Sequence, residues 1–274
     1  MLRAASYESL SGSLAKSETS TRRNTRGKGG QSRRKESRGK MRAVSSSSGA
    51  FPTEQVLELW RTSDAVAFDV DSTVCIDEGI DELGVYVGTG EKVARITKEA
   101  MEGGLPFGEA LQRRLEAMAI SRELLESYVK EHPPKFSPGI KELIAKLHAQ
   151  GKDVHLISGR FTQMIAPVAT ELGIPSENVH ANTIVFNEDG SLKGFDDKEF
   201  TSRAGGKADA VKFIKSTKGY KHVVMIGDGA TDLEARVSGG ADIVIGYGGA
   251  QRREKVVAES DWFVTEFDTL VNAL

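Results

Sequence analysis

The sequence of 274 residues has little or none of several features that define whole classes of proteins. Its one cysteine, Cys75, excludes a disulfide framework and a zinc site built from cysteines. No run approaches the ~18 consecutive apolar residues that a membrane-spanning helix needs, so we expect no membrane partner. The five histidines show no spacing typical of metal ligands. A hydrophobic share of 39% and a charged share of 28% then leave a globular chain of one large or two modest domains.

Acidic residues are scarce in the first 48 positions, although the whole chain carries a net charge of only −2. Residues 1–48 contain 12 Lys and Arg, 3 Asp and Glu and 12 Ser, so their net charge is +9, whereas the remainder carries −11. Such a segment cannot bury enough apolar surface to offset the entropy lost on ordering, so we expect it to be disordered. This composition is typical of an organelle transit peptide. We expect a plastid as the destination, with a mitochondrion or the cytoplasm as alternatives, and a mature protein that begins between Ser45 and Pro52.

A basic arm that contacts nucleic acid or an acidic surface is the competing interpretation of residues 1–48. Against it, the segment has one aromatic residue, Tyr7, and so lacks side chains that could stack on bases. The acidic remainder of the chain also argues against nucleic acid as a partner. A secretory signal is excluded, because no apolar stretch follows the early charges.

From Phe51 onward, short apolar segments alternate with stretches of helical periodicity. The expected strands cover residues 65–68, 154–157, 183–186, 223–226, 242–245 and 262–264. The expected helices include one that begins after Thr53 as its cap, and others over residues 140–147, 165–172 and 208–215. This alternation predicts an α/β fold, a doubly wound, Rossmann-like parallel sheet with helices on both faces.

Residues 80–132 interrupt that alternation, because their pattern is helical throughout. Leu111, Leu115 and Met118, for example, share one helical face. The segment is too long for an ordinary crossover between two parallel strands. We therefore expect a small helical domain, residues 80–132, inserted into an α/β core that comprises residues 53–79 and 133–274.

Polar side chains follow three of the expected strands at the point where each strand ends. Asp69 and Asp71 follow the first, Ser158 the second, and Asp228 and Asp232 a later one. We expect these side chains to converge, because ligands bind at the carboxyl ends of strands in open parallel sheets. Carboxylates from different strands suit a hard dication that prefers oxygen ligands, above all Mg²⁺. One carboxylate can then attack phosphorus while another, with a raised pKa, transfers protons.

Glycine-rich turns at Ser158-Gly159 and Gly227–Gly229 leave backbone N–H groups free to approach phosphate oxygens. Lys207 can neutralise the charge of a transferring phosphoryl group. Taken singly, each feature has a simpler explanation, since an Asp at a strand end is usually a helix cap and a lone Lys is usually solvated. The dinucleotide and P-loop fingerprints are both incomplete. Cys75 has no evident base beside it, which favours an inert thiol.

The combination of these features resembles the haloacid dehalogenase superfamily of phosphatases. All four motifs of that superfamily stand in order, namely Asp69-x-Asp71-x-Thr73, Ser158, Lys207 and Gly227-Asp228-Gly229-x-x-Asp232. Longer segments resemble the phosphoserine phosphatase family in particular, and they cover residues 68–74, 77–83, 106–107, 156–159 and 225–232. The resemblance runs from about Val56 to the C-terminus and implies hydrolysis of O-phosphoserine to serine and phosphate, the last step of serine biosynthesis.

The resemblance also implies how the acidic residues divide the chemistry. Asp69 would be the nucleophile that forms an aspartyl-phosphate. Asp71 would protonate the leaving serine oxygen and then deprotonate the water that hydrolyses the intermediate. Mg²⁺, the implied cofactor, would bind the carboxylates of Asp69 and Asp228 and the backbone carbonyl of Asp71, while Asp232 would support these ligands from behind.

Substrate-binding residues are likewise implied by the resemblance. The phosphate oxygens would be held by Ser158, Gly159 and Lys207, with Thr231 beside them. The inserted helical domain would be a cap that closes over the substrate and excludes water. From the cap, Glu78 would pair with the serine ammonium and Arg114 with its carboxylate, near Met101 and Phe107.

Two positions depart from the family pattern, because Arg160 and Glu102 stand where a glycine is usual. Arg160 follows the phosphate-binding turn, so it either strengthens anion binding or points outward. Glu102 puts a carboxylate near the expected edge of the cap, where a backbone N–H can still bind the substrate.

Two other functions stay open on the sequence alone. The same chemistry could act on another small phosphomonoester, such as phosphohomoserine or a phosphosugar. A phospho-accepting regulatory module without turnover is the alternative of a different class, but such a module has no need of an acid at Asp71. The sequence does not fix the oligomeric state, and a homodimer is one alternative.

Overall fold

The computed structural model describes residues 51–101 and 104–274. The predicted basic leader, residues 1–48, and Glu102 lie outside that part of the chain. The first helix, α1 (Glu54–Thr62), begins at the cap that the sequence indicates, because the Thr53 hydroxyl accepts a hydrogen bond from the Val56 N–H at 3.3 Å.

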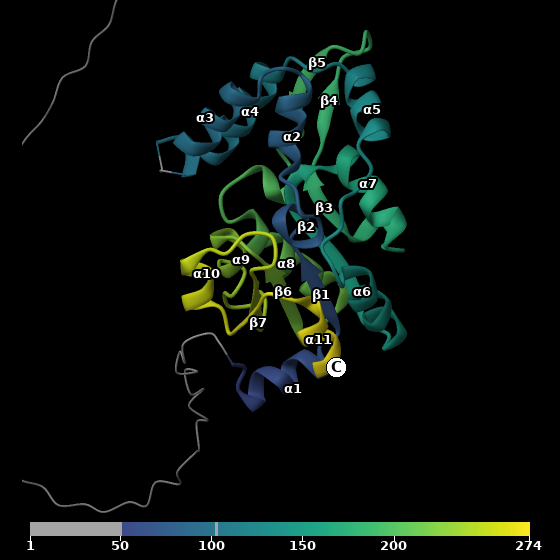
Figure 1. The fold of residues 1–274 in the computed structure, drawn as a ribbon, viewed down its shortest axis with the longest axis vertical. Coiled ribbons are helices and arrows are strands. Elements are labelled where there is room, and N and C mark those ends of the chain that lie inside the picture. Colours follow the sequence, from purple (N-terminus) through teal and green to yellow (C-terminus); the bar gives the residue numbers. More distant parts are fainter. Residues whose placement is uncertain (1–50, 102–103) are drawn as a thin grey trace, which may run out of the picture. The chain divides into compact units, whose positions relative to one another are not determined.

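Six strands form one parallel sheet in the order β3-β2-β1-β6-β7-β8 (Figure 1). They are β1 (Ala65–Phe68), β2 (Asp153–Phe161), β3 (Val179–Asn182), β6 (Val223–Gly227), β7 (Ile243–Tyr247) and β8 (Trp262–Val264). The chain runs outward from β1 through β2 to β3 and then returns to β6 on the other side of β1. The strand order therefore reverses between β1 and β6, the place where doubly wound sheets bind ligands. The predicted fold class is confirmed.

Helices cover both faces of this sheet. Successive side chains of a strand point to opposite sides, so a strand of apolar residues presents an apolar surface on each face that a helix can bury. Val66 and Phe68 of β1 pack into the larger hydrophobic core, and Ala65 and Ala67 pack into the smaller one. The helices that contribute to the larger core are α1, α6 (Ile140–Ala149), α7 (Thr162–Glu171) and α11 (Phe267–Ala273). Those that contribute to the smaller core are α8 (Gly206–Lys218), α9 (Ala230–Leu233) and α10 (Glu254–Glu259).

The structure corrects the sequence prediction at two places. The expected strand over residues 183–186 does not join the main sheet, since β4 (Ile184–Phe186) pairs antiparallel with β5 (Leu192–Phe195). The sheet instead takes β3, whose His180 and Asn182 interrupt any apolar run. The chain also ends in α11 rather than in a strand, because seven residues are too few to show a helical period clearly.

Four further helices lie between β1 and α6 and form the helical insertion: α2 (Gly79–Tyr86), α3 (Gly90–Met101), α4 (Phe107–Met118) and α5 (Arg122–Glu131). They bury a hydrophobic cluster of their own, which includes Leu83, Leu111 and Leu115. The β4–β5 hairpin, far away in sequence, adds Ile184 to this cluster and lies among these helices in Figure 1. The hydrophobic cluster of the insertion is therefore completed by a strand that the sequence analysis had placed in the main sheet.

Two linkers connect the helical insertion to the core, and they run side by side. The Ile76 N–H donates to the Lys135 carbonyl at 2.9 Å, and the Ser137 N–H donates to the Val74 carbonyl at 2.9 Å. The insertion thus leaves and re-enters the core through one paired stretch of backbone.

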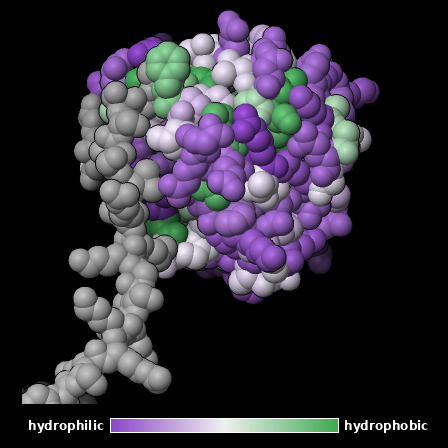
Figure 2. Space-filling view, turned by 90° about the horizontal axis from the view of Figure 1, so that it is seen from below, coloured by the Kyte–Doolittle hydropathy of each residue, from purple (hydrophilic) through white to green (hydrophobic). Residues whose placement is uncertain are grey.

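The molecular face in Figure 2 is mainly hydrophilic, with hydrophobic side chains in small, separate patches. Among the residues that the structure describes, the large hydrophobic side chains that are exposed are Phe51, Ile76, Val85, Tyr86, Phe213 and Val237. Of the helices within residues 51–101 and 104–274, none combines the length and the apolar character needed to cross a bilayer.

Candidate active site

Asp69 stands directly after β1, whose four residues are all buried. Its Oδ1 accepts a hydrogen bond from the Val70 N–H at 2.7 Å, and its Oδ2 lies 2.7 Å from the Lys207 Nζ. Only 7% of the residue is exposed. A rigid strand end and two opposite contacts therefore hold this carboxylate in one orientation.

A tight turn follows, and it separates Asp71 from Asp69. Within this turn, Val70–Val74, the buried Ser72 adopts a left-handed conformation with φ of 53°. A non-glycine residue in that region costs on the order of 1–3 kcal/mol, and such strain is typical of functional sites. The turn directs the Asp71 side chain toward the helical insertion, where its Oδ1 accepts the N–H of Gly79 at 2.8 Å.

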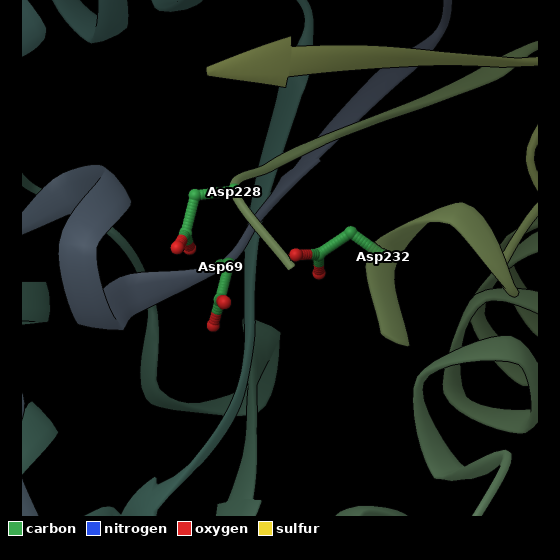
Figure 3. Close-up of side chains that lie close together, drawn as sticks. All are labelled: Asp69, Asp228 and Asp232. Carbon is green, nitrogen blue, oxygen red and sulfur yellow. The ribbon is translucent and has the colours of Figure 1, made fainter. Parts of the chain in front are cut away.

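Asp228 and Asp232 come from the end of β6 and the start of α9. The Asp232 Oδ2 accepts the Gly229 N–H at 2.9 Å, which fixes the turn between them. A Cβ atom at Gly227 would lie 2.1 Å from the Asp232 Cγ, so only glycine lets the two elements approach this closely. Asp69, Asp228 and Asp232 then offer carboxylate oxygens that all lie within 4.8 Å of one another (Figure 3).

Lys207, in the first turn of α8, reaches this acidic group. Its Nζ lies 2.7 Å from the Asp69 Oδ2 and 2.7 Å from the Asp232 Oδ1. Burial alone would lower the pKa of Lys207, but the two carboxylates outweigh burial and raise it. The lysine is therefore fully charged and is placed beside the expected nucleophile.

The three carboxylates fit a bound metal ion. Burial raises the pKa of Asp69, with Lys207 opposing and the Asp232 and Asp228 charges adding to the rise. Burial also raises the pKa of Asp228. Both raised pKa values mean that burial destabilises the ionised carboxylates more than the nearby cationic side chains stabilise them. A metal cation bound to their oxygens would stabilise the ionised forms.

Ser158 and Gly159 lie within the carboxyl-terminal part of β2, beside this group. Ser158 is fully buried, and its hydroxyl accepts the N–H of Arg160 at 3.1 Å. The Gly159 carbonyl accepts a hydrogen bond from the Asn182 side chain at 2.7 Å. A Cβ at Gly159 would lie 3.7 Å from the ring of Phe107, so the helical insertion reaches over this turn.

Glu78 of the linker and Arg114 of the insertion both lie near enough to Asp71 to interact with its charge. The Glu78 Oε1 accepts the Ser72 hydroxyl at 2.8 Å, and burial raises its pKa. Arg114 lies half-buried on α4, and its Nε donates to the Ala110 carbonyl at 3.3 Å. Burial lowers the pKa of Arg114, with the nearby charges of Asp81 and Asp71 opposing. Within residues 51–101 and 104–274, no carboxylate oxygen lies within the 4.0 Å ion-pair limit of this guanidinium.

Two other expected residues are placed less tightly. Thr231 is exposed in the first turn of α9, where its Oγ1 would lie 3.5 Å from a Cβ at Gly229. Met101 is the last residue of α3, and its side chain lies outside the described part of the structure.

Arg253 belongs to the site although no sequence motif indicates it. Its Nε donates to the Asp228 Oδ2 at 2.9 Å, and its Nη2 lies 3.6 Å from the Glu78 Oε1. Gln251 adds a hydrogen bond to the same Glu78 oxygen at 3.2 Å. The signal that could have found this loop is its position directly after β7, at the same edge of the sheet as the motifs.

The structure contradicts one of the two expectations for Arg160. Its side chain does not point outward, since only 5% of the residue is exposed. It instead turns toward Asp71, with Nε 2.7 Å from Oδ1, and toward Asp77, with Nη2 2.8 Å from Oδ1. The correction has a simple reason, because two partly buried carboxylates attract the guanidinium inward and offset the cost of burying it.

The fold and this acidic edge define a haloacid dehalogenase-like hydrolase, and residues 63–240 match that family. The chain is 54% identical over 223 residues to the chloroplastic phosphoserine phosphatase of Arabidopsis thaliana, which covers 81% of this chain and 76% of the relative. The chain belongs to the phosphoserine phosphatase family within this class of hydrolases, as the sequence motifs predict.

Solved structures are similar to the fold of this chain. The structure of DsGPDH of Dunaliella salina is 35% identical with a TM-score of 0.74, and the match covers 82% of this chain but only 38% of that one. A phospho-aspartyl intermediate analogue of phosphoserine phosphatase is 26% identical with a TM-score of 0.65, and it covers 77% of this chain and 99% of that one.

Proposed function

We propose that this chain hydrolyses O-phosphoserine to serine and phosphate through an aspartyl-phosphate on Asp69. The observation that carries the proposal is the convergence of Asp69, Asp228, Asp232 and Lys207 at one buried edge of the sheet. The Asp69 carboxylate attacks the phosphorus atom, the bond from phosphorus to the serine oxygen breaks, and the electron pair leaves with that oxygen. Lys207 is charged and adjacent, so it stabilises the negative charge of the transferring group.

Asp71 handles the proton in both halves of this reaction. In the first half it donates a proton to the departing serine oxygen, and in the second it removes one from the water that attacks the aspartyl-phosphate. The turn through Ser72 lets two carboxylates so close in sequence face different sides of the substrate. A nucleophile and a proton carrier are thereby built from one short segment.

Mg²⁺ is the cofactor that the all-oxygen donor set favours. We assign it to the carboxylates of Asp69 and Asp228 and the backbone carbonyl of Asp71, with Asp232 positioning Lys207. When bound, Mg²⁺ would neutralise phosphate charge and orient the phosphoryl group toward the nucleophile. Arg253, already bonded to Asp228, would hold that ligand in place from the outer side.

Recognition of the amino acid falls to the linker and the helical insertion. Glu78 has a carboxylate for the serine ammonium, and Arg114 has a guanidinium fork for the serine carboxylate. We assign Ser158, the Gly159 N–H and Lys207 to the phosphate oxygens, and Thr231 and Met101 to the rest of the substrate site. With Phe107 over Gly159, the insertion would act as a cap that excludes water during phosphoryl transfer.

We assign the protein to a plastid, with residues 1–48 as its transit peptide. The support is the basic, Ser-rich composition of this segment and the likeness to a chloroplastic relative. A fusion of residues 1–50 to a fluorescent protein should enter plastids, and fluorescence that stays in the cytoplasm would remove this assignment.

The substrate is tested by phosphate release from a set of small phosphomonoesters, each measured with Mg²⁺ and with EDTA. Phosphoserine should be preferred over phosphoethanolamine, which has the ammonium but lacks the carboxylate, and EDTA should stop turnover of both. Equal rates on the two substrates would instead indicate a general small-phosphate phosphatase.

A further inference from the structure

Arg160 is a buried cation whose role the proposed reaction does not use. It stands at the end of β2, one residue beyond the Ser158-Gly159 turn, and 6% of its side chain is exposed. A guanidinium cannot be buried to this degree without carboxylates beside it. The structure supplies two, Asp71 and Asp77, and they come from different segments of the chain.

The contacts with Asp71 all converge on one of its two oxygens. The Asp71 Oδ1 lies 2.7 Å from the Arg160 Nε, 2.5 Å from the Arg160 Nη2 and 2.8 Å from the Gly79 nitrogen. Among the described residues, no donor is bonded to Oδ2. The carboxylate is therefore held by one oxygen, while the other stays available for proton exchange.

The guanidinium is itself held by Asp77. The Nη2 that contacts Asp71 also donates to the Asp77 carbonyl at 3.1 Å and to the Asp77 Oδ1 at 2.8 Å. The backbone of Gly79 packs so closely against the guanidinium that a Cβ there would clash with Nε. Two carboxylates and the Gly79 backbone therefore confine the arginine to the orientation in which it holds Asp71.

We propose that Arg160 is a positioning residue that fixes the Asp71 carboxylate with Oδ1 tied and Oδ2 as the oxygen that exchanges the proton. Arg160 touches neither the substrate nor the reacting atoms. The proposal rests on the proposed function, because it requires Asp71 to be the proton carrier. The family resemblance predicts a glycine at this position, so the role is a feature of this chain.

The test measures how fast the enzyme is phosphorylated, by rapid quench of the full chain with Mg²⁺ present. Phosphoserine needs a proton on its leaving oxygen, whereas acetyl phosphate releases acetate, which does not. R160Q should slow phosphorylation by phosphoserine by about 10- to 100-fold, the cost typical of a misplaced catalytic group. It should leave phosphorylation by acetyl phosphate close to that of the wild type. Equal slowing with both substrates would overturn the proposal.

Two matched variants separate positioning from a general loss of structure. D77N removes one Arg160 ion pair but keeps the contacts with Asp71, so it should slow phosphoserine much less than R160Q does. R236Q breaks another Arg–Asp pair, with Asp261, away from the site. It should leave the ratio of the two substrates unchanged even if the melting temperature falls.

R160Q leaves two partly buried carboxylates without their cation, so R160K serves as a second variant. Lysine keeps the charge but lacks the fork that reaches both Asp71 and Asp77. It should therefore show the same difference between substrates at a smaller size. A rate for R160K equal to that of the wild type with phosphoserine would contradict the positioning role.

A double-mutant cycle distinguishes this inference from the proposed function. If Arg160 acts through Asp71, adding R160Q to D71N should slow phosphorylation by phosphoserine no further. The same fractional loss in both backgrounds would overturn the positioning role while Asp71 keeps its own. If D71N were as fast as the wild type, the acid role of Asp71 would fail by itself, whatever Arg160 does.

Discussion

The acidic edge of the sheet and the helical insertion are built in opposite ways. Asp69 and Asp228 stand at the ends of fully buried strands, and their carboxylates are already bonded to neighbouring donors. Arg114 is carried by a helix of the insertion, and no described carboxylate engages its guanidinium. The comparison teaches that the carboxylates at the acidic edge are held by neighbouring donors within the core, whereas Arg114 on the insertion is the proposed recognition residue that keeps its guanidinium clear of described carboxylate partners.

Removal of the proposed nucleophile at the acidic edge should abolish turnover. Asp69→Asn keeps the size of the side chain but takes away the attacking carboxylate and one proposed metal ligand. We expect kcat to fall by roughly 10⁴-fold or more, as is usual when a nucleophile is lost. Incubation with ³²P-labelled phosphoserine should then leave no labelled protein, and acid-stable labelling of the variant would place the nucleophile elsewhere.

Substitutions at the recognition residues of the insertion should lower kcat/KM for some substrates and not for others, because we assign these residues to substrate specificity. Arg114→Ala removes a charge-assisted pair, which costs about 2–4 kcal/mol, or roughly 30- to 1000-fold in kcat/KM for phosphoserine. The same variant should barely change kcat/KM for phosphoethanolamine, which has no carboxylate to lose. Glu78→Gln is the matched control, since both substrates carry the ammonium and both should suffer. An equal loss on the two substrates for Arg114→Ala would contradict its assigned partner.

A third region provides a reference that is buried and ionisable but takes no part in the chemistry. His155 of β2 is fully buried, its Nε2 lies 3.1 Å from the Tyr220 hydroxyl, and its Nδ1 has no partner. Burial, together with the nearby His180, lowers its pKa from 6.5 to about 4.

The sign of the resulting pH effect follows from that lowered pKa. As pH falls below 6.5, His155 becomes protonated in the unfolded chain, whereas in the folded protein it stays neutral until about pH 4. Its neutral state therefore stabilises the fold above pH 6.5, and this contribution is lost progressively toward pH 4. At pH 5 the loss should be on the order of 2 kcal/mol relative to pH 7. Urea unfolding of wild type and His155→Leu at both pH values measures it, and an identical pH dependence of the two proteins would exclude His155 as the cause.

The smallest effect is expected outside all three regions. A shortened chain that begins at Phe51 keeps every residue of the proposed site, so its kcat with phosphoserine should equal that of the full chain. Steady-state assays of the two proteins side by side are sufficient. A clear fall in kcat on shortening would give the leader a role in catalysis beyond targeting.

The acidic edge could be predicted from the sequence because its parts follow from local rules. A buried four-residue strand followed by Asp69 marks the carboxyl end of a parallel strand, and the Gly227–Gly229 turn marks another. Topology then brings such ends together without any knowledge of side-chain packing. The same reasoning gave the doubly wound sheet.

The remaining features depend on tertiary packing, which local rules do not contain. Arg160 could be placed at the right strand end, but only the positions of Asp71 and Asp77 in the folded chain decide where its guanidinium turns. Arg253 lies in a loop without a motif, and it enters the site because that loop folds back onto Asp228. The sequence analysis missed β3 because polar residues interrupt it. Polar side chains in this stretch are accommodated by hydrogen bonds to the neighbouring strand, and Asn178, directly before β3, donates to the Val154 carbonyl.

The paired linkers at residues 74–76 and 135–137 also bear on how such an enzyme can be altered. The two backbone crossings are hydrogen-bonded to each other, so the helical insertion is joined to the core at a single place along the chain path. A different recognition module could be spliced between these crossings without changing the spacing of the strands that carry the carboxylates. If the insertion selects the substrate as we propose, such a replacement should change the substrate, provided that the new segment restores the contacts which Asp77 and Gly79 make with Arg160.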